Sequence, residues 1–501
     1  MGSSSVTQEA VRARLVEIVG DDAIADGAGA EGRPGSIGAG AAGAHPPWLT
    51  VHPADTAQVQ QIVALANETG TPLVPVSSGD PHRHGGSTPA VEGAVAVDLR
   101  RMHHVLRVDS RNRLALIEPG VTYEQLIPAL AGKGLRIAMP LLPRRGKSVL
   151  ASLLEREPLT GPRWHWNAME PLRSLEVIWG NGERLFTGSG TFRGETDEDW
   201  EMGLIPVTGG GPGQLDYVRM LSGAQGTMGI ATWASVKCEP LPDAQTLLFV
   251  PAARLEDLVD CTCRLVRLRF GDELFVMNGA GLALALAGDP ADRSRLADAL
   301  PSWCLVVGIG GGPVLGAGKV AAREADIREI AAGFGLAVET AIPGATAAEM
   351  IQLLQEPAPE PYWKDRPEIG TLEVFFLTTL DRAPGFVASV KAASSALSAP
   401  LDGIGVYLQP IHQGVGTHCE FILPFERSDP AGVAAARELK VTASLALFRG
   451  GAYYSRPYGE WAGLVYDADP ATTRAIRLVK EIFDPNHVMN PGKLCFPGGG
   501  S

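Results

Sequence analysis

The sequence predicts an α+β protein of two domains, and three observations support this prediction. The chain has 501 residues, more than the roughly 100–200 residues of one ordinary domain. Its first half alternates short apolar stretches with turns rich in Gly and Pro. Its second half alternates strand patterns with helical patterns, which is typical of a sheet covered by helices.

The composition and charge of the chain argue against several classes of protein. With 45% apolar and 20% charged residues, it has the composition of a folded globular chain. The 43 Lys and Arg against 56 Asp and Glu give a net charge of −13, so we expect no nucleic-acid partner. No apolar run approaches the roughly 20 residues that cross a bilayer, so we expect no membrane contact. The six scattered cysteines favour free thiols in a reducing compartment, so we expect a cytoplasmic protein. We also expect it to form a homo-oligomer.

The N-terminal elements follow a β-α-β pattern. Residues 1–47 are expected to form a loose lead-in, because Gly and Ala dominate the second half of this segment. Apolar residues at helical spacing, ended by a glycine, predict a helix over 56–68. Apolar stretches at 73–76 and 94–99 predict strands on either side of the loop 77–88.

Two hairpins, a helix and a last strand complete the first half. An Asn-Gly pair at 181–182 lies between extended runs, which is a strong hairpin signal. The predicted hairpin strands are 105–109, 114–118, 175–179 and 184–187, the helix is 122–131, and the last strand is 230–238.

From about residue 243 the pattern changes to strand patterns that are separated by helical patterns. The predicted strands are 246–250, 273–277, 303–309, 372–378, 405–409 and 419–425. The predicted helices are 254–268, 317–334, 384–397, 430–448 and 470–482. We expect these elements to form one sheet with helices on one face.

The loop after the strand 73–76 has an unusual composition. Its small residues let backbone N–H groups approach an anion closely, and such a loop after a strand can hold a pyrophosphate. It is not a Rossmann fingerprint, because it does not open directly into a helix. The candidate cofactor-binding residues in it are Ser77, Ser78, Gly79, Asp80, Pro81, His82, Arg83, His84, Gly85, Gly86 and Ser87.

Several passages, taken in order, resemble one family of flavoproteins. "PLVPVSSGDPHRHGGSTP" resembles a pyrophosphate loop, and "VAVDLRRMHHVLRVDSRNRLALIEPGVTYEQL" resembles the strands and helix that follow it. "SVLASLLEREP", "LEVIWGNGERLFTGSG", "LSGAQGTMGIAT" and "IFDPNHVMNPGKL" resemble later parts of the same domain. The chain is therefore similar to the FAD-dependent vanillyl-alcohol oxidase and p-cresol methylhydroxylase (PCMH) superfamily.

The resemblance implies a two-domain PCMH-type FAD-binding fold with an α+β substrate domain, or cap. Residues 48–240 would form the FAD-binding domain, 241–470 the cap, and 471–501 a segment that returns to the FAD domain. FAD is the implied cofactor. The residues implied to hold it, besides the loop, are Pro119, Ser222, Gly226, Gly229, Ile230, Asn490 and Lys493. Asn490 and Lys493 are expected near the isoalloxazine ring, and His418 is the candidate for a covalent bond to it.

The sequence resembles the para-phenol-oxidising branch most. This branch holds a phenolate with tyrosines and an arginine, for which Tyr454 and Arg456 are the candidates, although Ser455 separates them. The loop tyrosine of the branch is replaced by His84. A carboxylate expected near the flavin falls at Asn167, with Glu170 a turn later. The candidate bases are His84, His165 and Glu170, and the implied reaction is hydride transfer from a benzylic carbon to flavin N5.

Two other functions stay open. A metal-assisted 2-hydroxyacid dehydrogenase of the D-lactate type would use His412 and His418, which flank a glycine turn, together with Glu420. We favour two histidines that line a flavin pocket and predict no metal. The missing carboxylate and tyrosines also allow a degenerate flavin-binding protein. The preferred enzyme would take a small aromatic substrate and pass its electrons to O2 or to an electron-carrier protein.

Overall fold

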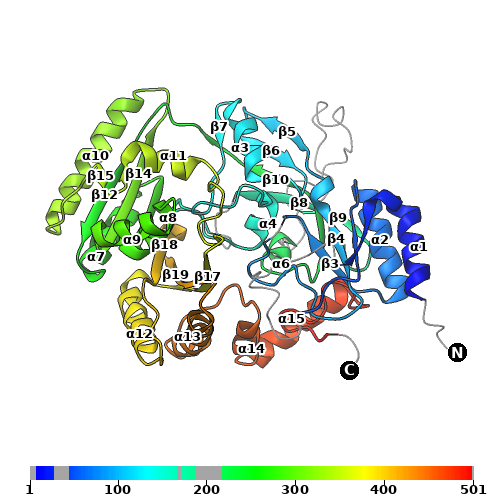
Figure 1. Ribbon diagram of the computed structural model, residues 1–501. Helices are drawn as coiled ribbons and strands as arrows, with labels where there is room; N and C mark the ends of the chain where they lie inside the picture. The colour runs from blue at the N-terminus through cyan, green and yellow to red at the C-terminus, as the bar shows by residue number, and fades with distance from the viewer. Residues whose placement is uncertain (1–6, 28–43, 80, 166–170, 188–216, 499–501) are drawn as a thin grey trace.

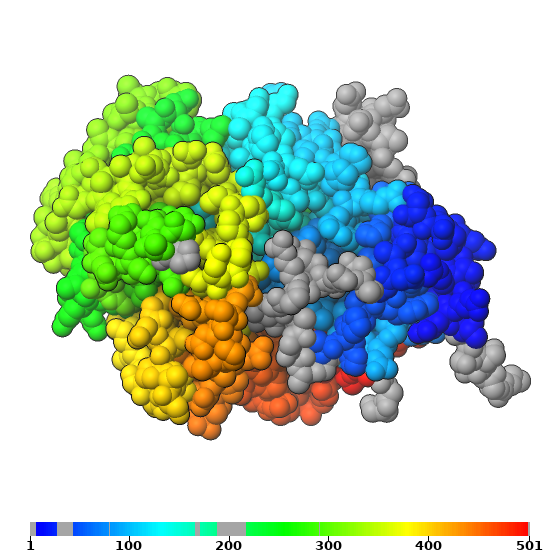
Figure 2. Space-filling model, viewed as in Figure 1, coloured from blue at the N-terminus to red at the C-terminus, as the bar shows by residue number. Residues whose placement is uncertain are grey.

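The structure is a computed structural model that describes residues 7–27, 44–79, 81–165, 171–187 and 217–498. Its largest sheets have four, five and six strands. Figure 1 shows that the four- and five-stranded sheets lie on one side of the molecule and the six-stranded sheet on the other. Figure 2 shows the two sides packed against each other. Among the described residues, we find no helix with the length and apolar character needed to cross a membrane.

Part of the predicted lead-in is folded. Helix α1 (Gln8–Val19) begins after Thr7, whose hydroxyl accepts a hydrogen bond from the Ala10 amide at 3.3 Å. Its buried residues are four apart and join the core cluster of helix α2 (Thr56–Thr69). Strand β1 (Ile24–Asp26) pairs with β2 (Leu49–Val51). The prediction of a loose segment is wrong here, because apolar residues at helical spacing precede the Gly- and Ala-rich stretch.

The first two sheets match the predicted β-α-β unit and hairpins. In the first sheet, β2 and β3 (Leu73–Val76) run parallel to the strand between them, β4 (Val95–Asp98). The second sheet is antiparallel, in the order β5-β6-β10-β8-β9. Its strands are β5 (Val105–Asp109), β6 (Leu114–Ile117), β8 (Leu172–Trp179), β9 (Arg184–Phe186) and β10 (Gly229–Lys237). The remaining elements of this half are α3 (Tyr123–Ala131), β7 (Leu135–Arg136), α4 (Val149–Leu154), α6 (Tyr217–Leu221) and β11 (Glu239–Pro240).

The third sheet contains all six strands predicted for the second half of the chain, in the order β12-β14-β13-β18-β19-β17. These are β12 (Ala244–Ala252), β13 (Glu273–Asn278), β14 (Trp303–Gly311), β17 (Ile369–Thr378), β18 (Gly405–Ile411) and β19 (Gly416–Glu426). The helices around it are α7 (Glu256–Arg267), α8 (Gly279–Leu286), α9 (Pro290–Ala299), α10 (Gly316–Gly333), α11 (Ala347–Gln355), α12 (Ala383–Ser395) and α13 (Pro430–Arg449).

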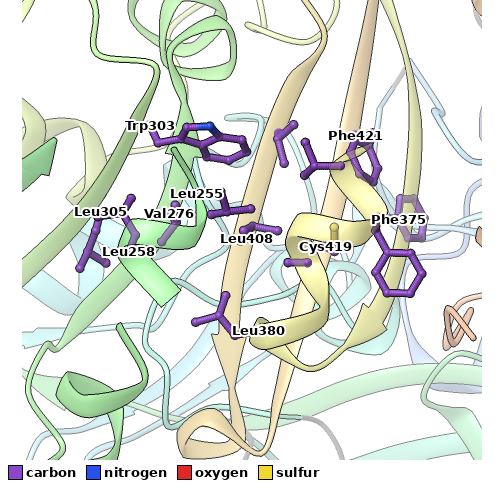
Figure 3. Close-up of a cluster of buried hydrophobic side chains, with 14 of the residues drawn as sticks. Leu255, Leu258, Val276, Trp303, Leu305, Phe375, Leu380, Leu408, Cys419 and Phe421 are labelled. Atoms are coloured by element: carbon purple, nitrogen blue, oxygen red, sulfur yellow. The ribbon is translucent and has the colours of Figure 1, made fainter. Parts of the chain in front are cut away.

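Helices cover both faces of this sheet, not one as predicted. Leu248 and Val250 of β12 face the cluster that includes α7, α10, α12 and α13, part of which appears in Figure 3. Their neighbours Leu247 and Phe249 face a second cluster with α8, α9 and α11. Successive side chains of a strand point to opposite faces, so a strand that is apolar throughout needs cover on both.

The C-terminal segment returns to the first sheet. After α14 (Glu460–Tyr466) and α15 (Pro470–Phe483), Met489 forms a β-bridge with Leu73 of β3. In Figure 1, α15 accordingly lies on the side of the first two sheets. The ammonium of Lys480 is buried and contacts Asp484 and the carbonyl of Thr227, so it ties α15 to the turn before β10. The boundaries at residues 240 and 470 stay predictions.

Candidate functional site

A large cavity lies between the loop after β3 and the third sheet. Its volume is about 210 Å³. The loop 77–87, the segment around α4 and the turn before β10 form its walls on one side. Glu373, Phe375, Tyr407 and Glu420, from β17, β18 and β19, form the wall on the other side. We call this space the larger cavity.

The loop at the edge of the larger cavity can bind an anion. Gly85 has a φ of +76°, and a Cβ added to it would meet no atom within 4 Å, so it faces open space. Within the described part of the chain, the amides of residues 83–87 donate to no protein acceptor, whereas the Thr88 amide donates to the Gly85 carbonyl at 3.2 Å. Unpaired amides beside a cavity suit the diphosphate of FAD. Asp80, also predicted to bind FAD, lies outside the described residues.

Asn490 and Lys493 hold this loop from behind. The side-chain amide of Asn490 donates to the carbonyls of Gly86 at 2.9 Å and Gln225 at 2.6 Å. The ammonium of Lys493 donates to the Gly85 carbonyl at 2.9 Å, and burial lowers its pKa. Neither side chain lines the larger cavity. In this structure both side chains fix the loop, and their predicted position near the isoalloxazine ring stays a prediction.

The turn before β10 supplies most of the other predicted FAD residues. Gly226, Gly229 and Ile230 line the larger cavity, as does Pro119. Gly226 has a φ of +70°, and a Cβ there would lie 2.4 Å from Cγ of Pro75, so only glycine fits. Ser222 is an exception, because it does not line the cavity and its hydroxyl accepts a hydrogen bond from Nε of Arg156 at 3.1 Å.

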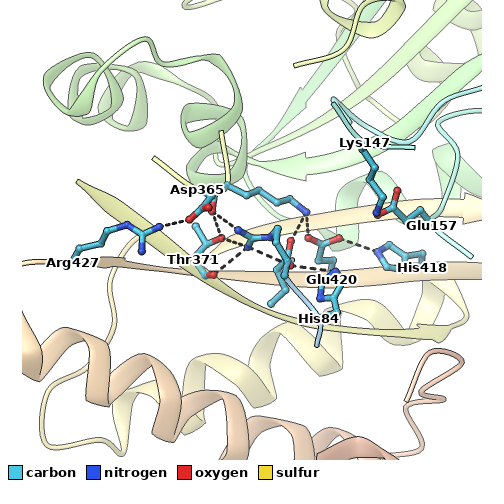
Figure 4. Close-up of polar contacts among 11 residues, drawn as sticks. His84, Lys147, Glu157, Asp365, Thr371, His418, Glu420 and Arg427 are labelled. Carbon is cyan, nitrogen blue, oxygen red and sulfur yellow. Dashed lines mark hydrogen bonds and ion pairs between the residues drawn. The ribbon is translucent and has the colours of Figure 1, made fainter. Parts of the chain in front are cut away.

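A network of buried charges joins the loop to the third sheet (Figure 4). Nζ of Lys364 contacts Glu420 and lies 2.7 Å from Oε1 of Glu373. The guanidinium of Arg83 lies 3.4 Å from Oε2 of Glu373 and donates to the Thr371 hydroxyl at 2.8 Å. Although burial opposes ionisation, these cations hold the pKa values of Glu373 and Glu420 below the usual range. The side chain of Arg83 therefore links the loop to the third sheet.

His84 lies in the larger cavity as an uncharged ring. It stacks on Tyr458 with ring centroids 5.1 Å apart, and its Nε2 lies 3.8 Å from Oε2 of Glu373. Burial, which outweighs Glu373, lowers its pKa to about 4. His84 can therefore accept a hydrogen bond at neutral pH, and its predicted role as a base stays a prediction.

The shifted pKa of His84 predicts loss of stability in acid. Its pKa falls from 6.5 to about 4 on folding, so between these pH values the unfolded chain binds more protons than the folded chain. The free energy of unfolding should therefore fall as pH drops through this window, by up to about 3 kcal/mol from this residue. Guanidinium denaturation of flavin-free protein should show a smaller fall in His84→Gln. The exposed His103→Gln is the control, and equal slopes in both variants would contradict the assignment.

Arg456 is a buried cation whose charge helps to lower the pKa of Glu157, a carboxyl that lines the same two cavities. The residue is 5% exposed, and among the described residues its guanidinium makes no hydrogen bond or ion pair. It lies over the Phe375 ring, with Cζ 3.9 Å from the centroid. A buried guanidinium is costly unless it is paired, so this one is suited to an anionic group of a ligand.

Tyr454 does not accompany Arg456, which corrects the predicted pair. Its hydroxyl donates to the Ser444 carbonyl at 2.9 Å, and its ring packs on Trp461 in the core on the other side of the sheet. Tyr458 lines the larger cavity instead, and its hydroxyl has no hydrogen-bond partner in the described part of the chain. Both tyrosines lie in the same aromatic segment of the sequence, so spacing could not separate them.

A smaller cavity adjoins the larger one. Glu157, Pro158 and Arg456 line both. Apart from these three, its lining is Leu153, Arg156, Leu159, Trp164, His165, Pro171, Leu377, Ile411, His418 and Ser455. This largely apolar wall suits the apolar part of a small organic ligand.

The structure places His165, a candidate base, at the wall of the smaller cavity. Asn167 and Glu170 lie outside the described residues. The His165 ring stacks on that of His412, with centroids 6.0 Å apart, and burial lowers its pKa to about 4. Its predicted role as a base stays a prediction. Glu157, which the sequence only placed in a family motif, is a carboxylate at the junction of the cavities.

The residues of the metal hypothesis do not assemble. His412 stacks on His165, whereas Nε2 of His418 lies 3.1 Å from Oε2 of Glu420. In the described ranges, no three His, Cys, Asp or Glu side chains are grouped so as to hold a metal ion. His418 and Glu420 do share one face of β19, as strand alternation predicts. His418 lines the smaller cavity and not the larger one, and its covalent bond to flavin stays a prediction.

Comparison with known proteins supports FAD as the cofactor of this chain. Residues 47–188 match the FAD binding domain family. One curated relative is 1'-carboxy-chondrochloren decarboxylase of Chondromyces crocatus, with 29% identity over 61% of this chain and 57% of the relative. A second is glycolate oxidase subunit GlcD of Bacillus subtilis, with 27% identity over 40% of this chain and 39% of the relative. A third is the flavoprotein subunit of 4-cresol dehydrogenase of Pseudomonas putida, with 27% identity over 35% of this chain and 33% of the relative. The chain thus spans little more than half of the first relative and less of the others.

Two solved structures share the fold over nearly the whole chain. They are 4-ethylphenol oxidase from Gulosibacter chungangensis, with a TM-score of 0.82 and 20% identity, and p-cresol methylhydroxylase with substrate bound, with a TM-score of 0.81 and 18% identity. Each match covers 99% of this chain and 99% of the other. The predicted FAD cofactor and the predicted fold are both confirmed. Residues 47–188 of the chain thus match an FAD binding domain, and the whole chain shares the PCMH-type fold of these two solved structures.

Proposed function

We propose that the chain is an FAD-linked oxidoreductase that oxidises a phenolic or other aromatic alcohol whose ionised oxygen is bound by Arg456. The single observation that carries this proposal is the buried guanidinium at the junction of the two cavities, which forms no direct hydrogen bond or ion pair with the residues that the structure describes. Its neighbours Phe375 and Tyr458 supply aromatic surface and a free hydroxyl. An arginine beside a hydroxyl donor binds an oxyanion, and the apolar wall of the smaller cavity would receive the aromatic body.

The larger cavity would hold FAD. The amides of the loop 77–87 would bind its diphosphate, and Gly226, Gly229 and Ile230 would line its path. When bound, FAD supplies the acceptor for a hydride and so allows a two-electron oxidation. Arg456 would bind the substrate oxygen, Phe375 would orient its ring, and Leu159, Leu377 and Ile411 would exclude water. We include O2 or an electron-carrier protein as the final acceptor.

The proposal predicts which small molecules reduce the flavin. In anaerobic stopped-flow mixing with FAD-loaded protein, 4-ethylphenol should bleach the flavin at least about 100-fold faster than its methyl ether, because the ether cannot form the oxyanion that pairs with Arg456. The two compounds differ little in shape, so the comparison isolates the ionised oxygen. Equal rates for the phenol and the ether would contradict this role of Arg456. No bleaching by any phenol or acid would favour a degenerate flavin-binding protein.

A second candidate substrate is a carboxylic acid. Arg456 would bind a carboxylate as well as a phenolate, and the residue before it is Ser455 rather than a tyrosine. One relative is named a decarboxylase and another a glycolate oxidase subunit. In the same assay, 2-hydroxyacids and arylacetic acids that bleach the flavin faster than phenols would favour this candidate. Release of one CO2 per flavin reduced would identify a decarboxylation.

A further inference from the structure

His418 is a buried histidine at the wall of the smaller cavity. It lies on β19, is 2% exposed, and lines the cavity beside Arg456, Leu377 and Ile411. A substrate oxygen bound by Arg456 in this cavity would therefore lie beside the imidazole of His418. The placement brings together a cation that stabilises an oxyanion and a ring that can take a proton.

The hydrogen bond to Glu420 fixes which nitrogen of His418 is available. Nε2 lies 3.1 Å from Oε2 of Glu420, as Figure 4 shows. A carboxylate accepts hydrogen bonds, so this geometry assigns the proton of the neutral ring to Nε2 and leaves a lone pair on Nδ1. Lys364 contacts the other oxygen of Glu420 and keeps that carboxylate ionised.

The groups around His418 favour a neutral ring in the free protein. Burial is the main cause that lowers its pKa, and the charges of Arg456 and Lys364 act in the same direction. The hydrogen bond to Glu420 acts in the opposite direction. The other titratable groups that face it are Tyr407 on β18 and Arg156, Glu157 and His165 across the smaller cavity. The ring can therefore accept a proton at neutral pH.

We propose that His418, oriented by Glu420, is the base that takes the hydroxyl proton of the substrate bound at Arg456, an inference that rests on the proposed function. The O–H bond of the substrate breaks, its electron pair stays on the oxygen, and the proton forms a bond to Nδ1. The resulting imidazolium is balanced by Glu420, and the oxyanion by Arg456. No electron is transferred in this step, and the later two-electron oxidation uses FAD as acceptor. Glu420 is a positioning residue.

This role competes with covalent attachment of flavin. A ring whose Nε2 donates to Glu420 has only Nδ1 for either a bond to flavin or a substrate proton. We therefore expect acid precipitation of wild-type protein to leave the flavin in the supernatant. Flavin that stays with the denatured wild type and is released from His418→Asn would overturn the inference.

Proton release on ligand binding tests the base directly. FAD-loaded protein is titrated with 4-nitrophenol at mildly acidic pH in two buffers of different ionisation enthalpy, while the phenolate band is followed in the visible range. In the wild type we expect phenolate to bind with close to no proton released to the buffer, because His418 retains it. In His418→Asn, each bound phenolate should release one proton, or the phenolate band should be lost. Equal proton release per phenolate in both proteins would overturn the inference.

The variants include a control histidine away from both cavities. His487 lines neither cavity and has a positive φ that Asn tolerates, so His487→Asn should behave as the wild type. Glu420→Gln keeps His418 but removes the carboxylate that raises its pKa, so the acid limb of kcat/KM should move to lower pH. His418→Asn should lower kcat/KM by about 10²–10⁴-fold and abolish that limb, with flavin content unchanged.

The two levels of failure are distinguishable. A wild type that binds no phenol and whose flavin no phenol reduces would overturn the proposed function, and this inference with it. A wild type that turns over phenols, beside a His418→Asn variant with the same acid limb, would overturn only the role of His418.

Discussion

Arg456→Met is expected to lower kcat/KM for a para-substituted phenol by about 30- to 1,000-fold, with FAD still bound. Arg456 is buried between the two cavities, and among the described residues its guanidinium forms no direct ion pair, although its charge helps to lower the pKa of Glu157. The oxyanion of the substrate would lose its counter-charge in a site that excludes water. Such a loss costs about 2–4 kcal/mol of transition-state stabilisation. Steady-state kinetics and the flavin absorbance of the purified variant provide the two measurements.

Arg382→Met is the matched control for this variant. Arg382 also lies over an aromatic ring, with Cζ 5.4 Å from the Phe386 centroid, but it is exposed and lines neither cavity. Its loss should leave kcat/KM unchanged. If Arg456→Met lowers only the melting temperature and leaves turnover per folded molecule unchanged, the guanidinium has a structural role and the oxyanion site is wrong.

Gly85→Asp is expected to weaken FAD binding by about 100-fold or more. A Cβ at this position would enter open space beside the loop, so the new carboxylate would face the diphosphate. Two like charges about 4 Å apart repel by about 4 kcal/mol near a protein surface. Flavin absorbance per protein during reconstitution with FAD measures the effect.

Gly85→Asn separates charge from backbone strain. Asn has the same shape as Asp, and both tolerate the positive φ of +76° better than other side chains. We expect the Asn variant to bind FAD far more tightly than the Asp variant, and the difference to shrink at high salt. Equal losses in both variants would mean that the loop conformation, rather than the anion, determines binding.

The sequence predicts the fold well because its signals are local. The Asn-Gly turn at 181–182, the glycine loop 77–88 and the alternating pattern after residue 243 each specify one element. The structure contains all of them. The helix over 8–19 escaped prediction because the adjacent low-complexity stretch dominates the composition of the first 47 residues.

The site is predicted less completely because its partners are far apart in the chain. Arg83 and Glu373 are 290 residues apart and meet only when the loop docks on the third sheet. The sequence gives one indication that Glu373 has a buried partner. It is the lone charge in the largely apolar strand β17 (Ile369–Thr378), where an unpaired carboxylate would be costly. Lys364 gives no such signal. The sequence also cannot show which of Tyr454 and Tyr458 lies in the larger cavity, because both belong to a segment without helical or strand periodicity.

A crystal structure of FAD-loaded protein with 4-iodophenol tests the central claim most directly. Anomalous scattering locates the iodine independently of the refined ligand. The account predicts the phenol oxygen within about 3 Å of the Arg456 guanidinium, and the iodine in the smaller cavity against Leu159, Leu377 and Ile411. A ligand that binds elsewhere, with Arg456 paired to a carboxylate of the protein, would contradict it.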